Sequence, residues 1–145
     1  KAVSCSQIEY SPSIRPISTQ TNQSGYTQGH IFGGFVNDSW KVDFCHYFGS
    51  GECFLFKVHP YVRIYPWART NSHFVYGSSS GIAFGSRPVG ATDAAHPGLF
   101  LDASLEWGSS AAAPGSTFGN EPLASALEFR AVKVEAWLFD SSKHL

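Results

Sequence analysis

The amino-acid sequence predicts a mainly β protein, an antiparallel β-sandwich with a few short flanking helices. Apolar or alternating runs of three to eight residues recur at short spacing from Ile31 onward, which is typical of strands. Turn-forming residues separate these runs, as at Gly49-Ser50-Gly51 and Pro114-Gly115-Ser116. No amphipathic helical stripe of useful length appears. Together these patterns favour packed antiparallel sheets with little helix.

The first part of the chain, residues 1–28, differs from the rest in composition. It is rich in Ser, Gln, Thr, Asn and Pro and has few apolar runs. We expect a flexible or diverged segment here, with at most a short extended piece from Ile14 to Ile17 and a loop from Ser18 to Gly25. The domain itself is then expected over residues 29–140, and residues 141–145 form a tail.

Within that domain the strands follow one another in short order. A possible short helix over Glu121 to Leu127 would have Asn120 as its N-cap. The expected strands are Ile31–Val36, Cys53–Val58, Arg63–Tyr65, Phe74–Tyr76, Gly81–Phe84, Leu99–Asp102 and Val132–Phe139.

The strand from Cys53 to Val58 is the most distinctive, because it is apolar on both faces. A strand with so little polar face is expected to be covered on both sides, which marks the centre of the fold. Its predicted faces are Phe54, Phe56 and Val58 on one side and Cys53 and Leu55 on the other, with Lys57 emerging at the end.

Composition narrows the class of protein. The 145 residues suit one compact domain, and 43% hydrophobic residues allow a real core. Only 14% of residues are charged, the net charge is −1 and no basic stripe is visible, so nucleic-acid binding has no electrostatic support. No apolar run is long enough for a transmembrane segment. The sequence starts with Lys1 and contains no Met, so we expect a fragment of a longer chain.

Cysteine and histidine offer the first chemical alternatives. The three cysteines are an odd, sparse set, which favours a reducing, cytoplasmic setting over a disulfide framework. Cys45 and His46 with Cys53 form the best local metal cluster, but zinc sites usually have two close ligands at each end. Cys45 is also the better candidate for a reactive thiol, since Cys53 lies in an apolar run where a thiol usually packs as a small hydrophobe. We therefore expect no metal and no other cofactor.

Carboxylates and glycine-rich loops give weaker alternatives. Glu52 and Glu135 each adjoin a strand with aromatic neighbours, and an edge or capping role is expected over general acid–base work. The stretch Gly77 to Gly81 lacks the Lys and helix of a phosphate-binding loop. Trp40, Trp67 and other aromatics could line a sugar-binding face, although such residues are more often core and rim of a sandwich.

Six motifs follow one another in order over residues 29–139. They are Gly29-His30-Ile31-Phe32-Gly33-Gly34-Phe35, Gly51-Glu52-Cys53-Phe54-Leu55-Phe56, Tyr65 to Asn71 with Phe74, Gly98-Leu99-Phe100-Leu101-Asp102, Ser116 to Leu123, and Val134 to Phe139. Together these motifs resemble the TLDc domain family, in forms that suit both its oxidation-resistance and its mEAK7-like branches. The resemblance implies that family-motif positions here are Gly34, Trp40, Gly51, Glu52, Trp67, Asn71, Asp102, Asn120, Glu135 and Trp137.

The resemblance also implies a function. Members of this family have no accepted catalytic centre, protect cells from oxidative stress, and in several cases bind and regulate the vacuolar-type proton ATPase (V-ATPase). We therefore expect a non-catalytic protein-interaction module, not an enzyme, with V-ATPase subunits as candidate partners and a cytoplasmic location that includes the periphery of vacuolar or lysosomal membranes. The alternatives are a structural component of another large assembly, such as a cytoskeletal one, and a thiol-based peroxide scavenger.

Overall fold

A computed structural model describes residues 13–19, 29–40, 46–86, 97–111 and 115–138. These residues form strands and loops, and no helix occurs among them. The mainly β, antiparallel prediction is confirmed, whereas the expected flanking helices are absent from the described part of the chain. The strands are β1 (Ser13–Thr19), β2 (His30–Phe35), β3 (Phe54–His59), β4 (Arg63–Tyr65), β5 (Val75–Ser78), β6 (Gly81–Phe84), β7 (Leu99–Asp102), β8 (Trp107–Ser109), β9 (Glu128–Val134) and β10 (Trp137–Leu138).

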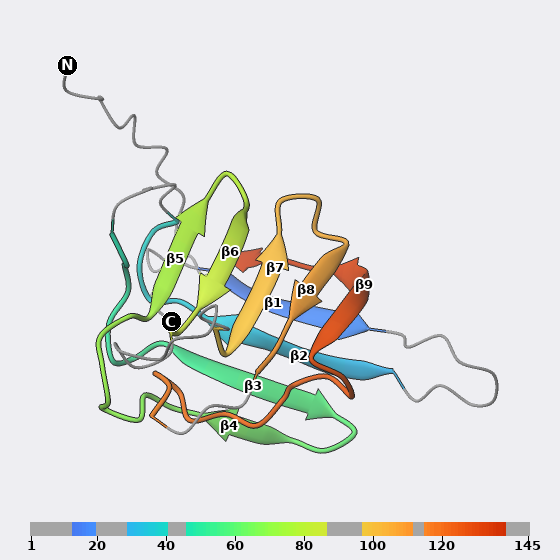
Figure 1. Ribbon diagram of the computed structural model, residues 1–145, viewed down its shortest axis with the longest axis horizontal. Coiled ribbons are helices and arrows are strands. Elements are labelled where there is room, and N and C mark those ends of the chain that lie inside the picture. Colours follow the sequence, from blue (N-terminus) through green and yellow to red (C-terminus); the bar gives the residue numbers. More distant parts are fainter. Residues whose placement is uncertain (1–12, 20–28, 41–45, 87–96, 112–114, 139–145) are drawn as a thin grey trace, which may run out of the picture.

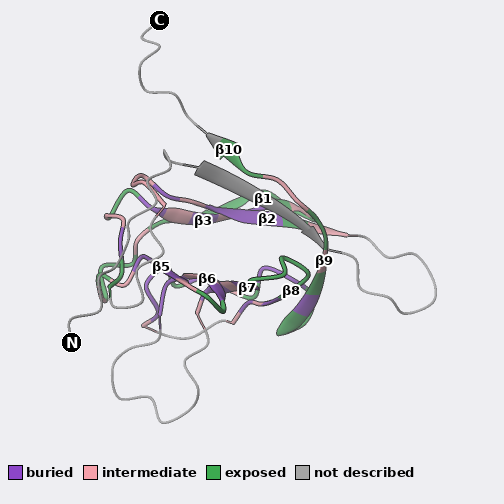
Figure 2. Cartoon of the chain, turned by 90° about the horizontal axis from the view of Figure 1, so that it is seen from above, coloured by how far each residue is buried: buried purple, intermediate pink, exposed green. Residues whose placement is uncertain are grey.

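The strands form two antiparallel layers that are joined through β9 (Figures 1 and 2). The pairing order is β4-β3-β2-β1-β9-β8-β7-β6-β5, and β10 pairs with β1 beside β9. Figure 2 shows β1, β2 and β3 in one layer and β5 to β8 in the other, with β9 at the end where the layers meet. The first and second halves of the chain therefore each supply most of one layer, and a single strand closes the sandwich.

A β-bulge in β9 accounts for this closure. Residues Glu128 to Arg130 pair with β8, whereas Lys133 pairs with Ser18 of β1 and Ala131 pairs with Thr19. Val132 is thus an extra residue opposite the β1 strand. A bulge of this kind bends a strand and increases its twist, which lets β9 leave one layer and enter the other.

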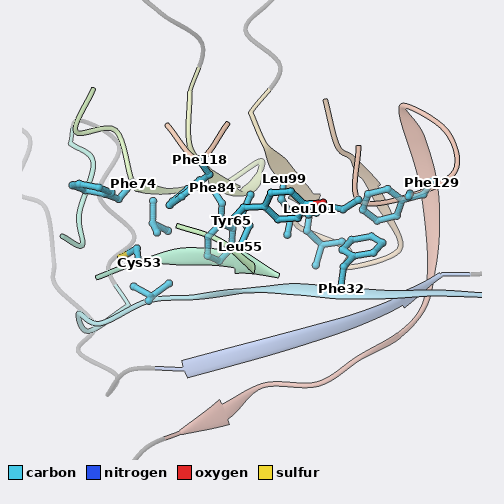
Figure 3. Close-up of a cluster of buried hydrophobic side chains, with 14 of the residues drawn as sticks. Phe32, Cys53, Leu55, Tyr65, Phe74, Phe84, Leu99, Leu101, Phe118 and Phe129 are labelled. Atoms are coloured by element: carbon cyan, nitrogen blue, oxygen red, sulfur yellow. The ribbon is translucent and has the colours of Figure 1, made fainter. Parts of the chain in front are cut away.

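The core lies between the two layers (Figure 3). Phe32 of β2 meets Phe129 of β9 edge to face, with ring centroids 5.1 Å apart, so the core continues up to the joining strand. Aromatic side chains fill much of this space, and aliphatic side chains such as Leu55, Leu99 and Leu123 pack between them. Buried members include Phe32, Leu55, Tyr65, Phe74, Phe84, Leu99, Leu101, Phe118, Leu123 and Phe129.

The predicted helix at Glu121 to Leu127 is wrong. The segment runs as an irregular loop, and its backbone groups bond to other elements. The N–H of Leu123 donates to Ser110 Oγ at 2.9 Å, and the carbonyl of Leu127 accepts from the N–H of Ser110 at 2.8 Å. Asn120, the expected cap, instead turns its side chain into the protein. These long-range bonds replace the local bonds that a helix would need.

The two faces of β3 also differ from the prediction that both are covered. Cys53 and Leu55 are buried, and Lys57 does not emerge but is only 4% exposed on the same inner face. The opposite face is part-exposed, and Val58 there is 46% exposed. β3 lies second from the edge of its layer, beside the short edge strand β4, so the fold does not centre on it.

Three further differences concern strand boundaries. β1 lies within residues 1–28, which were set apart from the domain, and it includes Ser18 and Thr19, which were expected in a loop. β8 was not predicted, since a three-residue strand containing Gly108 carries almost no periodic signal. The single strand expected from Val132 to Phe139 is split, because Glu135 and Ala136 separate β9 from β10. The rest of residues 1–28 and the tail at 141–145 lie outside the described residues.

Candidate interaction surface

Polar residues at the entry of β3 form a network around Asn37, a residue that the sequence analysis did not single out. The Asn37 side-chain amide donates to Ser50 Oγ at 2.7 Å and to Glu52 Oε2 at 2.8 Å. Its carbonyl oxygen accepts from the N–H of Ser50 at 3.1 Å and from the Cys53 thiol at 3.2 Å. Glu52 thus lies at the strand entry and helps to hold it. No short-range pattern could have linked Asn37 to residues so far along the chain.

Two of the motif glycines make room for aromatic rings. A Cβ at Gly34 would lie 2.4 Å from Cε1 of Phe84, which is on the facing layer. Trp40 packs edge to face on the same Phe84 ring, with centroids 6.2 Å apart. Likewise, a Cβ at Gly51 would lie 2.5 Å from Cε3 of Trp67. At both positions glycine allows an aromatic ring to approach the backbone closely.

Trp67 packs against Gly51 and also bonds to Asn71. Asn71 in turn bonds to Thr117 on another loop. The indole N–H of Trp67 donates to the Asn71 carbonyl at 2.6 Å. Thr117 Oγ1 donates to Asn71 Oδ1 at 2.7 Å and accepts from the N–H of Ser86 at 2.9 Å. Thr117 is fully buried. Its hydroxyl joins its own loop to the segments that carry Asn71 and Ser86. Thr117 lies within one of the sequence motifs. Thr is a common residue, however, and nothing in the sequence marked this one as a structural residue.

Asn120 has a comparable role on another loop. Its side-chain amide donates to the carbonyls of Gly98 at 3.1 Å and of Glu121 at 3.0 Å. Ser110 Oγ donates to the same Gly98 carbonyl at 2.7 Å. The side chains of Ser110 and Asn120 fix the start of β7 against the loop before β9. This loop is therefore held by bonds to other elements and not by helical bonds within itself.

Glu121 and Lys57 form a further polar cluster that the sequence analysis missed. Glu121 Oε1 accepts from the hydroxyl of Tyr61 and, at 2.8 Å, from that of Tyr65. Lys57 Nζ lies 3.5 Å from the same oxygen and donates to the Pro122 carbonyl at 2.9 Å. The hydrogen bonds from Tyr61 and Tyr65 lower the pKa of Glu121 to about 2, and burial with the Glu121 bond raises the pKa of Tyr65. Lys57 is buried because these partners satisfy its charge.

The remaining motif residues lie apart from these networks. Asp102 holds the turn between β7 and β8: its Oδ1 accepts from Ser104 Oγ at 2.9 Å and from the N–H of Trp107 at 3.1 Å. These bonds, that from Ser104 first, lower the pKa of Asp102. Glu135 forms an ion pair with Lys133, and Trp137 is exposed on β10. The fold thus brings Gly51, Trp67 and Asn71 together. The motif carboxylates Glu52, Asp102 and Glu135 do not meet at one site.

The chemical alternatives find little support in the described residues. Those residues contain no group of three or more His, Cys, Asp or Glu side chains that could hold a metal ion. Cys53 is 1% exposed, and burial raises the pKa of its thiol, the opposite of an activated nucleophile. Cys45, the alternative thiol, lies outside the described residues. His73 Nδ1 is 2.6 Å from Ser86 Oγ, but Ser86 is only 7% exposed, and its backbone N–H donates to Thr117 Oγ1 at 2.9 Å.

Among the described residues, the outward side of β2, β3 and β4 is unusually apolar for the surface of a sheet. Outward positions of an antiparallel sheet are normally polar. Here Phe35 stacks on Phe54 with ring centroids 4.9 Å apart, and Phe56 pairs with Ile64, which is 60% exposed. We call this set the outer apolar face; it comprises Ile31, Phe35, Phe54, Phe56, Val58 and Ile64.

A second exposed region lies at the bulge of β9. Trp107 is exposed and the guanidinium of Arg130 lies 6.0 Å from the centre of its ring. A hollow of about 390 Å³ beside them is lined by Leu105, Glu106 and residues 130–134. Lys133 and the bulge at Val132 stand on this edge of β9, and both are features that discourage another strand from pairing there. We therefore regard this hollow as a protected sheet edge.

Comparison with known proteins gives the family. A model of the TLDc domain matches residues 10–140. The chain belongs to the TLDc domain family. It is 32% identical to human nuclear receptor coactivator 7 over 130 residues, which cover 90% of this chain and 12% of that protein. It is 32% identical to zebrafish MTOR-associated protein MEAK7 over 118 residues, covering 77% of the chain and 25% of the relative.

Oxidation resistance protein 1 of Xenopus tropicalis is similar to the same degree, at 32% identity over 114 residues that cover 79% of the chain and 12% of the relative. This TLDc chain thus spans a quarter or less of the length of these relatives. The matched region begins at residue 10, so it includes β1, in agreement with the place of β1 inside the sheet. Equal likeness to the oxidation-resistance and MEAK7 proteins assigns it to neither branch.

Proposed function

We propose that this TLDc chain is a non-catalytic protein-interaction module that binds and regulates a V-ATPase and thereby contributes to resistance to oxidative stress. The observation that carries the proposal is the outer apolar face. A part-exposed cluster of large apolar side chains marks an interaction surface more often than it marks bare protein surface. On this proposal the protein acts in the cytoplasm and at the periphery of vacuolar or lysosomal membranes. Among the described residues no helix has the length and hydropathy needed to cross a membrane.

The absence of a reaction is part of the proposal and has its own support. The polar motif residues Asn71, Asp102 and Asn120 make hydrogen bonds to backbone and loop groups, while the buried atoms Asn71 Nδ2 and Asn120 Oδ1 have no hydrogen-bond partner among the described residues. Catalysis needs polar groups that converge on a place where substrate can bind. Side chains that hold loops together leave the outer surface as the part of the molecule that can act.

The direct test is purification of the tagged chain from gently lysed cells. We expect V-ATPase subunits among the co-purifying proteins, and their absence would count heavily against the proposal. An Ile64→Glu variant should lose the subunits, since a charge on the outer apolar face disfavours burial against a partner. A matched variant, Leu127→Glu, alters a similarly exposed apolar residue on a loop away from that face and should retain them.

Two other functions remain as alternatives with different outcomes. A structural role in another large assembly, such as a cytoskeletal one, predicts that Ile64→Glu releases that assembly and that no V-ATPase subunit is found with the wild-type chain. A thiol-based peroxide scavenger predicts that Cys45→Ser or Cys53→Ser abolishes protection from peroxide. Protection that persists in both cysteine variants excludes the scavenger.

A further inference from the structure

Arg69 has a backbone conformation that is unusual for its residue type. Its φ is 62°, in the left-handed region that favours glycine, because a Cβ crowds the backbone there. Hydrogen bonds on both sides hold it in this conformation. The N–H of Ala68 donates to the Thr117 carbonyl at 2.8 Å, and Thr70 Oγ1 donates to the Ser116 carbonyl at 2.9 Å. Strained residues of this kind are concentrated at ligand-binding and switch positions, so the Arg69 side chain is a candidate binding group.

Leu105, the other positive-φ residue besides glycines among the described residues, has a local explanation that Arg69 lacks. Leu105 has a φ of 61° and closes the hairpin turn between β7 and β8, where its N–H donates to the Asp102 carbonyl at 3.0 Å. A left-handed residue commonly ends such a turn. Arg69 instead lies in the loop that leads from β4 to β5 in the other layer. No hairpin therefore requires its conformation.

The guanidinium of Arg69 is held in place but has no anionic partner. It lies 5.4 Å from the centre of the Trp67 ring, and Arg69 is exposed. Arg63 is similar, since it is exposed and lies 5.5 Å from the centre of the Tyr65 ring. Neither guanidinium forms an ion pair with a described residue. A guanidinium stacked on a ring keeps N–H donors at its edge for a bidentate bond to a carboxylate.

Arg63 and Arg69 lie on the same border of the sandwich. The loop that runs from Ser116 to Glu121 passes beside the segment that carries both arginines (Figure 1). This loop accepts the two bonds that flank Arg69 and, at Glu121, the bond from the Tyr65 hydroxyl. The six positions from Arg63 to Arg69 span at most roughly 20 Å, at about 3.3–3.6 Å each. We call Arg63 and Arg69 the basic border.

The basic border carries positive charge that the fold leaves unpaired. Glu121 is the only carboxylate in residues 63–70 and 116–121, and Lys57 lies 3.5 Å from its Oε1, so those two charges offset each other. Two guanidinium groups remain. They are too few for a lipid surface, which attracts clusters of about four to eight Lys and Arg. A chain of net charge −1 is also unsuited to nucleic acid. The complementary partner is therefore an acidic segment of a protein.

We propose that the basic border binds an acidic, extended segment of a partner protein, with one carboxylate on Arg69 and a second on Arg63. Arg69 is the main anchor, because its backbone is fixed before the partner arrives and its head group is already positioned on Trp67. This surface differs from the outer apolar face, and its occupant is not required to be the V-ATPase. Neither proposal therefore depends on the other.

The variant Arg69→Gly separates a binding role from a structural one. Glycine adopts the left-handed conformation without strain but has no guanidinium. We expect its unfolding temperature to equal or exceed that of the wild type, while the bond to the acidic segment is lost. An arginine kept only for its packing on Trp67 would give the opposite result: a lower unfolding temperature with undiminished binding.

Nuclear magnetic resonance on the whole chain measures the binding. The probe is a blocked peptide of six glutamates, which when extended spans roughly 20 Å. The side-chain Nε–Hε signals of the arginines are followed as the peptide is added. We expect saturable shifts at Arg63 and Arg69 and none at Arg130, the internal control. Arg130 is also exposed and lies over a tryptophan ring, 6.0 Å from its centre, but on β9.

Matched variants sharpen the measurement. Arg69→Gln removes the charge and should weaken binding of the glutamate peptide at least fivefold. Arg130→Gln makes the same change at the control position and should bind as the wild type does. A blocked peptide of six glutamines should give no shifts, because it has the same length without carboxylates.

The outcomes distinguish this proposal from its rivals. Equal shifts at Arg130, or shifts caused by the glutamine peptide, overturn it. Binding of the wild-type chain to phosphatidylserine vesicles, without a response to the glutamate peptide, overturns it in favour of a membrane surface. The peptide contains no part of the V-ATPase, so each of these results leaves the proposed function standing, and failure of that function appears only in the co-purification.

Discussion

The side-chain amide of Asn37 donates a hydrogen bond of 2.8 Å to the carboxylate of Glu52, fifteen positions further along the chain. The same amide group bonds to Ser50 and accepts from the thiol of Cys53. One asparagine thereby fixes the turn from which β3 starts. The motif residue Glu52 acts here as one partner of a structural network, and the residue at its centre lies outside the six recognised motifs.

Asn37→Ala should therefore destabilise the protein more than Glu52→Ala. Loss of Asn37 leaves several polar partners unsatisfied, at a cost of about 1–3 kcal/mol, whereas loss of the exposed Glu52 removes a single bond worth about 1 kcal/mol. Denaturant unfolding of both variants measures the difference. Glu128→Ala, an exposed glutamate on β9, is the control and should change little. Equal destabilisation by all three substitutions would contradict the network.

Thr117→Val should be destabilising by about 1–3 kcal/mol, because it leaves the buried N–H of Ser86 without its acceptor and removes one of the two donors to Asn71 Oδ1, the other being the N–H of His73. Thr70→Val is the matched control. Thr70 Oγ1 also donates to a carbonyl, that of Ser116, but Thr70 is exposed and water can replace the bond. Thermal unfolding of the two variants should therefore separate them by several degrees; a larger effect at Thr70 would show that the Thr117 bonds contribute little.

Gly34→Ala should destabilise the sandwich by about 1–3 kcal/mol, since a Cβ at that position overlaps the Phe84 ring. The second substitution Phe84→Leu removes the overlapping ring atoms. In a double-mutant cycle the paired change should therefore cost less than the sum of the two single changes. Strict additivity would mean that the ring moves aside without strain.

Acid should weaken the protein partly through Glu121. Its pKa falls from 4.5 to about 2 on folding. The unfolded chain therefore takes up this proton first, so the stability that the carboxylate contributes is fully present above pH 4.5 and is lost as the pH falls toward 2. Glu121→Gln has no such proton to bind. Unfolding temperatures of the two proteins should differ above pH 5 and converge near pH 2, and a constant gap across this range would reject the assignment.

Local patterns in the sequence predicted much of the fold and little of the polar structure. β4, β6 and β7 have the predicted bounds, because each is a compact apolar run between turn residues. β1 was underestimated, since its polar residues give no alternation, yet it lies between β2 and β9. The helix at Glu121 to Leu127 failed because Ser110 and Asn120 capture that loop through contacts between distant residues.

The candidate surface could be predicted only in part. The apolar character of both faces of β3 was visible in the sequence, but which face would be buried depends on the bend of β9 and the approach of the second layer. The same limit applies to Lys57 and Glu121, which meet across sixty-four positions. Pairings of this kind arise from the closed sandwich and leave no trace in local periodicity.

The central claim is that the motif residues maintain the fold and that the outer apolar face carries the function. The most direct test measures both V-ATPase binding and thermal unfolding for the variants Thr117→Val and Ile64→Glu. Binding is measured at a temperature at which each variant is still folded. The account predicts that Thr117→Val unfolds earlier but still binds, and that Ile64→Glu unfolds like the wild type but does not bind. Undiminished binding by the folded Ile64→Glu variant would contradict it.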